Sequence, residues 1–353
     1  MKRPLLNQFR GAIAGAVLGL VRESTPLGWL ERFPMDALDS VGPDDQAAAR
    51  ESLQPITQYS SASQAVRTIF FNLTHALIHH QNILAVVESS GPASPVRLTT
   101  PTDAALALLP VLLYFHDEPQ QLPHRIGPLV EAIAPPSCLT SVLLIGHTFS
   151  QMLIYPVSAR EMVPRLMAQL EDAAIANLEV TQLGQQLSQI QQWLDAPPGL
   201  AEMRAAWRSP SAAQPQANLA DSTHSWLTML VLYSFLCTPG DFSLSQQRSQ
   251  QAVGVALGAG AAIASVQGLV GALVGAYLGD GGLPIAGHLA MAAAADSSFD
   301  VPLLATQLFA AWAGVHQPQM VPSARGLVQV GAIAAALPPS ARAGGNSLLD
   351  DRP

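Results

Sequence analysis

Hydrophobic and polar residues follow one another in a pattern that predicts helices along most of the chain. From Phe9 to Val21 nearly all residues are apolar, and Gly11, Gly15 and Gly19 recur at every fourth position. Residues four apart share one face of a helix, so these glycines would form a flat face for close packing. The run is short for a membrane span, and it lacks the cleavage site and polar mature start of a signal peptide. We therefore expect a buried first helix.

Two further apolar patterns predict helices in the first half of the chain. One begins at Tyr59 and ends near His80, and the other spans about Ser137 to Ile154. Between them, the segment TTPTD at 99–103 marks a change from loop to helix and offers a capping residue. Pro110 should kink the helix that follows or end its first half, because proline cannot donate a backbone hydrogen bond.

The clearest amphipathic pattern runs from Glu161 to Leu194, where glutamine fills most of the polar face. The apolar stripe consists of Leu166, Leu170, Leu183, Leu187, Ile190 and Leu194. This spacing predicts a long helix packed on the core of the protein. An exposed hairpin and a partner-binding helix are the alternative interpretations.

The composition fits one large folded domain. The chain has 353 residues, of which 49% are hydrophobic, so it can bury a sizeable core. We expect a single all-α domain over residues 1–337, with a variable helical insertion at about 156–223. Residues 338–353 are small and polar for the most part, which is typical of a disordered tail.

The scarcity of charge narrows the range of partners. Charged residues make up 12% of the chain, and the net charge is −8. Lys2 is the single lysine and the arginines do not cluster, which argues against binding of nucleic acid. A surface so poor in charge is typical of one that a protein partner covers in part.

The cysteines and histidines give no metal-ligand pattern. Cys138 and Cys237 lie in apolar surroundings without metal-ligand spacing, so we expect reduced, buried thiols and a cytoplasmic location. His75 and His79 are one helical turn apart, a spacing that can bind a metal, but no carboxylate comes before Glu88 to complete a site. We expect them on the polar face of a surface helix.

The stretch from Gln251 to Ile285 is the longest uncharged part of the chain, with no charged residue before Asp280. It is long enough to span a bilayer, yet its bulk is Gly and Ala, which gain little on transfer into lipid. Gly258-x-Gly260 begins a partial dinucleotide fingerprint, but Ile263 replaces its third glycine and no β-α-β pattern surrounds it. A membrane span and a nucleotide turn are thus two interpretations of this stretch.

A third interpretation comes from resemblance to a known family. Residues 226–284, from WLTMLVLYSFLCTPGDF to GAYLGDGGLP, are similar to the signature region of the ADP-ribosylglycohydrolase family, which includes the dinitrogenase reductase-activating glycohydrolase. In that family a helix ending in a phrase like AFL-x-x-PGDF precedes a Gly-Asp-x-Asp-Thr metal motif and a helix resembling GALAGAYYG. RGAIAGAVLGL, QYSSASQAVRTIFFNLTHAL and PTDAALALLPVLLYFHD resemble other helices of the family. The likeness covers most of the chain from Phe9 to about Ala295, except the Gln-rich helix.

The resemblance implies an ADP-ribosylglycohydrolase-like orthogonal helical bundle. Members of the family release ADP-ribose from a protein side chain or a related acceptor, with two Mg²⁺ or Mn²⁺ ions held by carboxylates. The aligned positions carry no acid in this chain. These vestigial positions are Ser60, Ser61, Ala62, Ser63, Ala259, Ala261 and Ala262. The resemblance therefore implies a pseudoenzyme without the metal cofactor and without the catalysis of the family.

A residual pocket is the remaining candidate site. Asp103 takes the place of the substrate-contacting loop of the family, and His147 lies on the next apolar helix. The resemblance implies that Thr102, Asp103, His147 and Tyr277 could flank this pocket. The alternative is a capping aspartate and a hydrogen-bonded core histidine.

These observations favour a catalytically inactive binding or regulatory module. Its partner would be a protein or, in the vestigial cleft, a nucleotide-like ligand. The first alternative is an active hydrolase that removes ADP-ribose from a modified protein or small molecule through a relocated or metal-free site. The second alternative is a membrane-associated helical protein.

Overall fold

The regular elements are all helices in the part of the chain that the structure describes. The structure is a computed structural model, and it describes residues 3–22, 61–90, 97–155, 157–172, 178–196, 219–257, 262–285, 287–288 and 300–315. The α-helices are α1 (Leu5–Arg22), α3 (Ser61–Ile78), α4 (Ile83–Ser90), α5 (Pro101–Ala107), α6 (Leu109–Tyr114), α7 (Leu122–Ile133), α8 (Leu139–Ile154), α9 (Ala159–Asp172), α10 (Leu178–Asp195), α12 (Leu219–Cys237), α13 (Phe242–Leu257), α14 (Ala262–Leu278) and α16 (Val301–Trp312). Two short 3-10 helices are η3 (Pro136–Cys138) and η4 (Asp280–Gly282). The prediction of an all-α protein is confirmed for these residues.

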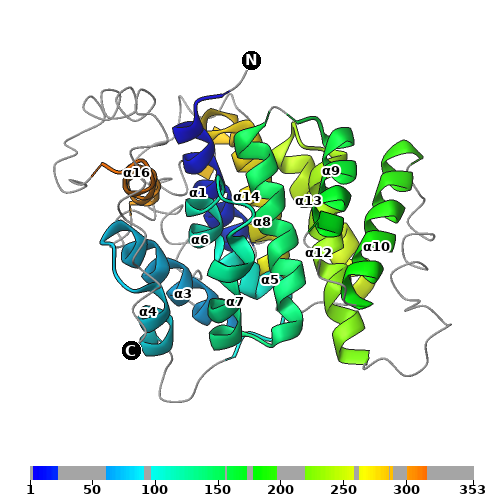
Figure 1. Cartoon of the computed structure of the whole chain (residues 1–353). Coiled ribbons are helices and arrows are strands. Elements are labelled where there is room, and N and C mark those ends of the chain that lie inside the picture. Colours follow the sequence, from blue (N-terminus) through cyan, green and yellow to red (C-terminus); the bar gives the residue numbers. More distant parts are fainter. Residues whose placement is uncertain are drawn as a thin grey trace.

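Helices α1 and α14 lie side by side in the middle of the fold and form its most extensive helix pair (Figure 1). Helices α5, α6 and α8 lie over this pair, while α9, α10, α12 and α13 occupy one flank and α3, α4 and α16 the other. Phe9, Ala12 and Ile13 of α1 have no exposed surface. The prediction of a buried first helix is therefore confirmed.

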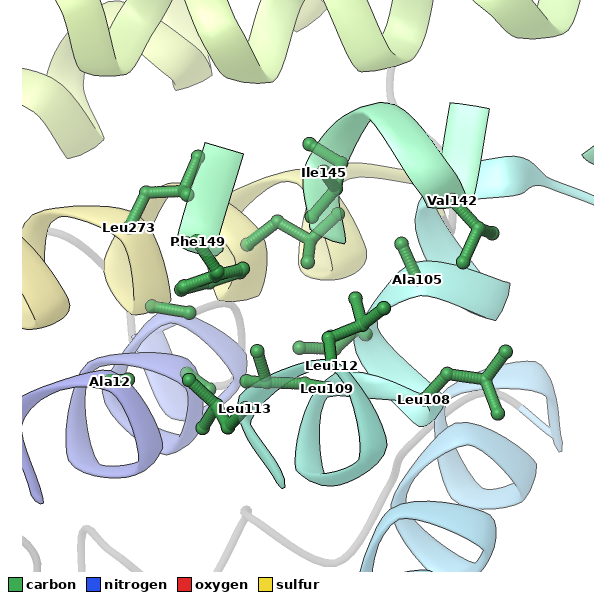
Figure 2. Close-up of a cluster of buried hydrophobic side chains, with 14 of the residues drawn as sticks. Ala12, Ala105, Leu108, Leu109, Leu112, Leu113, Val142, Ile145, Phe149 and Leu273 are labelled. Atoms are coloured by element: carbon green, nitrogen blue, oxygen red, sulfur yellow. The ribbon is translucent and has the colours of Figure 1, made fainter. Parts of the chain in front are cut away.

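Helices α8 and α6 pack against each other through large apolar side chains. In Figure 2, Val142, Ile145 and Phe149 of α8 lie over Leu109 and Leu112 of α6. All five side chains are fully buried. Burying a side chain of this size contributes about 1.5–3 kcal/mol relative to leaving it exposed. This layer fixes the position of α5, which leads directly into α6.

Glycines allow α1 and α14 to approach each other closely. A methyl group on Gly11, Gly15 or Gly19 would overlap a backbone carbonyl oxygen of α14. The carbonyls belong to Gly275, Gly271 and Gln267, in that order, so the two helices run antiparallel. The flat glycine face expected from the sequence is confirmed, and its partner is the second half of the uncharged stretch.

The start of α5 follows the capping chemistry expected from the sequence. Thr100 has an extended backbone, and its side-chain oxygen accepts a hydrogen bond of 3.1 Å from the Asp103 backbone N–H. Helix α5 ends at Ala107, and α6 begins at Leu109 with Pro110 in its first turn. Pro110 has no backbone N–H to donate to a carbonyl oxygen one turn earlier. The expected break at Pro110 is therefore observed as the boundary between α5 and α6.

The expectation of one long helix over the Gln-rich segment is wrong. The apolar stripe is divided between α9 and α10, which pack against each other. Leu166 of α9 and Leu187 and Ile190 of α10 are buried. Folding back lets the two halves of the stripe cover one another and pack on α8 and α12, whereas a single helix of this length would reach beyond the core. The expected core packing is confirmed.

The uncharged stretch forms a packed helix pair. Its residues belong to α13 and α14, which contact each other, and residues 258–261 between them lie outside the described residues. The segment VGVAL before Gly258 is the end of a helix, whereas a dinucleotide fingerprint requires a strand there. Within the described residues, Pro136–Ile154 is the stretch long and apolar enough to cross a bilayer, and most of it is buried inside the fold.

Candidate functional site

A buried carboxylate joins the first turns of two helices. Asp103 stands in the first turn of α5, and Ser265 stands in the first turn of α14. The Ser265 hydroxyl donates a hydrogen bond to Asp103 Oδ1, and the two residues are 5% and 2% exposed. Hydrogen bonds to carboxylates are among the stronger ones in proteins. The pair therefore ties α5 to α14.

The polar groups next to Asp103 in the sequence are hydrogen-bonded to one another at the start of α5. Thr102 is fully buried, and its hydroxyl lies 3.1 Å from the hydroxyl of Thr100. The Thr100 oxygen in turn accepts from the Asp103 backbone N–H. The start of α5 is thus a closed set of hydrogen bonds that holds the aspartate in place.

Those vestigial positions that the structure describes lie in the first turns of two helices. Ser61 is the first residue of α3, and Ala262 is the first residue of α14, one turn before Ser265. Ser60, Ala259 and Ala261 lie outside the described residues. Ala62 and Ser63 follow Ser61 in the first turn of α3. The start of α14 therefore brings a vestigial position next to the partner of Asp103.

His147 lies on a different face of the core. It is buried on α8, and its Nδ1 has no hydrogen-bond partner among the described residues. Ser150 Oγ and Gln151 Oε1, on the same face of α8, are likewise buried without a partner there. Ile145 of α8 points toward α6 in Figure 2. His147 follows two residues later, which is a rotation of about 200° around the helix axis, so it points away from α6. His147 Nδ1 is therefore a buried ring nitrogen without a hydrogen-bond partner in the described part of the chain.

Acidification should destabilise the protein through His147. Burial lowers the pKa of this imidazole below its ordinary value of 6.5. As the pH falls below 6.5, the unfolded chain therefore takes up a proton that the folded chain excludes. We expect the free energy of unfolding to fall as the pH is lowered from 7, by up to about 1.4 kcal/mol per pH unit from this residue.

Chemical denaturation at several pH values measures this effect. His147→Gln keeps a polar side chain but removes the titration, so its free energy of unfolding should depend less on pH than that of the wild type. Equal slopes for the two proteins would show that His147 does not contribute.

Tyr277 lies apart from the other residues of the expected pocket. It is half-buried near the end of α14, with its ring 6.0 Å from that of Phe235. Ser265, which bonds Asp103, lies near the other end of the helix, about 18 Å away at 1.5 Å per residue. The fold therefore keeps Thr102 and Asp103 together at the start of α5 and places Tyr277 away from them, near the other end of α14.

His75 of α3 and His79, just after the helix, match the interpretation as surface residues. His75 and His79 are exposed, and their rings stack with centroids 6.2 Å apart. In the part of the chain that the structure describes, no group of three or more His, Cys, Asp or Glu residues is placed to hold a metal ion.

Both cysteines are free thiols, as expected from the sequence. Cys138 is buried, whereas Cys237 on α12 is half-buried. Burial raises the pKa of the Cys237 thiol, and burial is also the main cause that raises the pKa of the adjacent Tyr233 to about 12. Both groups therefore stay protonated near neutral pH.

Sequence reasoning missed a set of buried polar residues on α13. Ser245, Gln246 and Ser249 have no exposed surface, although the segment looks like an exposed polar helix. Gln246 Nε2 donates a hydrogen bond of 2.8 Å to the Gln267 carbonyl oxygen on α14. The acceptor is a backbone carbonyl, which any residue type would provide at position 267, so no residue in the sequence signalled this contact.

The chain was compared with models of known protein families and with curated proteins. No family model matches it, and no curated protein does.

Proposed function

We propose that the chain is a catalytically silent protein with an ADP-ribosylglycohydrolase-like orthogonal helical frame, and that it acts by binding a protein partner. Two kinds of observation support the proposal. The order of helical phrases resembles that family, and the helices that would carry the metal ligands begin with serine or alanine at Ser61 and Ala262.

Asp103 carries the proposal. A carboxylate that binds a metal ion or acts on a substrate must face that group. Asp103 is 5% exposed, and it accepts a hydrogen bond from Ser265 inside the junction of α5 and α14. A carboxylate enclosed in this way stabilises the junction between the helices. The burial of Asp103 and its bond to Ser265 therefore support a structural role for this aspartate.

The proposed mode of action is recognition of another protein in the cytoplasm. Charged residues make up only 12% of the chain, and protein interfaces are depleted in charge at their centres. Among the residues that the structure describes, the large apolar side chains that remain exposed are Tyr155, Leu244, Ile285 and Leu303. The stripe residues Leu166, Leu183, Leu187 and Ile190 are buried in the protein's own core, so they are not available to a partner.

An assay for released ADP-ribose tests the proposed silence. The chain is incubated with an ADP-ribosylated protein in the presence of Mg²⁺ or Mn²⁺, beside an active family member and a buffer blank, and free ADP-ribose is measured by chromatography. We expect release at the rate of the blank. Release above the blank that disappears in an Asp103→Asn variant would assign hydrolysis to this chain and overturn the proposal.

A further inference from the structure

A second candidate site lies at the opposite end of α14 from Asp103. A cavity of about 350 Å³ opens there between the start of α1 and the turn that follows α14. Its lining residues are Arg3, Asn7, Leu278, Gly279, Gly281 and Gly282. The length of α14 separates this cavity from Ala262 by about 25 Å. The site is therefore independent of the proposed function.

Local backbone conformation brings the cavity walls together. Gly279 has φ of 69°, in the left-handed region that favours glycine, and this turns the chain away from the axis of α14. A Cβ at this position would lie 3.5 Å from Arg3 Cδ and 3.5 Å from Asn7 Cβ. Arg3 Nη1 donates a hydrogen bond of 2.9 Å to the Tyr277 carbonyl oxygen. The guanidinium group is thus held at the cavity with its other N–H groups left to donate.

Arg3 and Asn7 both bring side-chain N–H groups to the cavity. Asn7 contributes a carboxamide, and both Asn7 and Arg3 are exposed to solvent. The hydrogen bonds of the turn use the N–H groups of Gly279, Gly282 and Leu283, and they do not involve that of Gly281. A Cβ on Gly281 would meet no atom within 4 Å, so the backbone is open to a ligand there.

The acid of the turn is paired with basic groups beside the cavity. Asp280 Oδ2 lies 3.7 Å from Arg10 Nη1, and Asp280 Oδ1 lies 3.9 Å from His288 Nδ1. The negative charge of Asp280 is therefore offset by Arg10, while the charge of Arg3 has no carboxylate within ion-pair distance among the described residues. The local charge at the cavity is positive, in a chain whose net charge is −8.

We propose that this cavity binds a small oxyanion, a phosphate or carboxylate group of a metabolite, through Arg3, Asn7 and the Gly279–Gly282 turn. Arginine can donate two parallel hydrogen bonds to either group, because its planar fork matches the spacing of two oxygens in each. Glycine residues let the ligand approach the backbone closely. The volume is at the lower end of pockets that hold small molecules, so a single anionic group with a small organic part fits.

Calorimetric titration of the full chain with inorganic phosphate, and separately with acetate, tests the proposal. We expect saturable binding of at least one anion by the wild type, and the tighter of the two identifies the ligand chemistry. Arg3→Gln should weaken binding about tenfold or more, which corresponds to about 1.4 kcal/mol for the lost charge-assisted contact. The matched control Arg97→Gln removes an exposed arginine away from the cavity and should bind as the wild type does.

A second variant separates loss of binding from loss of folding. Gly281→Ala places a methyl group in open space at the cavity wall, so it should weaken anion binding without lowering the melting temperature. Absence of saturation up to about 10 mM anion, where sites of millimolar affinity are still detected, would overturn the proposal. Binding that is equally strong in the wild type and in Arg3→Gln would overturn it as well.

Discussion

Replacing Gly15 by alanine is expected to lower the free energy of unfolding by about 3 kcal/mol or more. The added methyl group would overlap the carbonyl oxygen of Gly271 across the helix pair. A flexible side chain could move aside, but this contact is with backbone, so the two helices must separate. Helices α1 and α14 form the most extensive pair of the fold, and their separation disturbs every layer that packs on them. Urea denaturation followed by circular dichroism measures the loss.

Gly184→Ala is the matched control for Gly15→Ala. Gly184 lies inside α10, and a Cβ there meets no atom within 4 Å. Alanine is favoured over glycine within a helix by about 0.5–1 kcal/mol, so this variant should be as stable as the wild type or slightly more stable. A denaturation midpoint of Gly15→Ala equal to that of the wild type would contradict the close packing of α1 on α14.

Removing the Asp103 side chain is expected to lower the free energy of unfolding by about 2–3 kcal/mol. Asp103→Ala deletes the acceptor of the Ser265 hydroxyl, and a buried polar group that loses its charged partner costs this much. Ser265→Ala removes the donor instead. If the two side chains stabilise the fold through each other, the double variant should cost at least about 1 kcal/mol less than the sum of the single variants.

Asp300→Ala provides the control for Asp103→Ala. Asp300 caps α16 by accepting a hydrogen bond from the Leu303 N–H, and it is exposed. Losing such a cap costs about 1 kcal/mol, and its effect should add to that of Ser265→Ala without coupling. Additive losses for Asp103→Ala and Ser265→Ala would contradict the assignment of Asp103 to the tie between α5 and α14.

The parts of the fold that depend on local chemistry could be predicted from the sequence. The spacing of Gly11, Gly15 and Gly19 by four residues determines that they share a face, whatever their partner is. Thr100 and Pro110 act on their own backbone segments, as a cap and as a helix break. These expectations were correct because each depends on neighbours within one helical turn.

The features that the sequence did not reveal depend on contacts between distant residues. Ser265 bonds Asp103 across more than one hundred and sixty positions, and no local pattern pairs these two side chains. The stripe from Leu166 to Ile190 is compatible with one helix or with two, and its packing on α8 and α12 selects the hairpin. Likewise, Gln246 is buried because Gln267 offers it a carbonyl oxygen.

The candidate site differs from the sequence prediction in how its residues are distributed. The resemblance grouped Asp103, His147 and Tyr277 around one pocket. The fold instead places Asp103 at the start of α5, where it bonds Ser265 in the first turn of α14. His147 lies on α8, and Tyr277 lies near the other end of α14. Only Thr102 and Asp103 lie together, because they are neighbours in one helical turn. Residue identities alone did not determine the distance between Asp103 and Tyr277, since it follows from the bond of Asp103 to Ser265 at the opposite end of α14 from Tyr277.

Titration of the purified chain with Mn²⁺, followed by calorimetry, tests the proposed catalytic silence most directly. The family that the sequence resembles requires carboxylates to hold its two ions, and the vestigial positions from Ser60 to Ser63 and from Ala259 to Ala262 provide none. With Asp103 committed to Ser265, we expect no saturable binding of Mn²⁺. Two tight Mn²⁺ sites per chain would contradict the proposal.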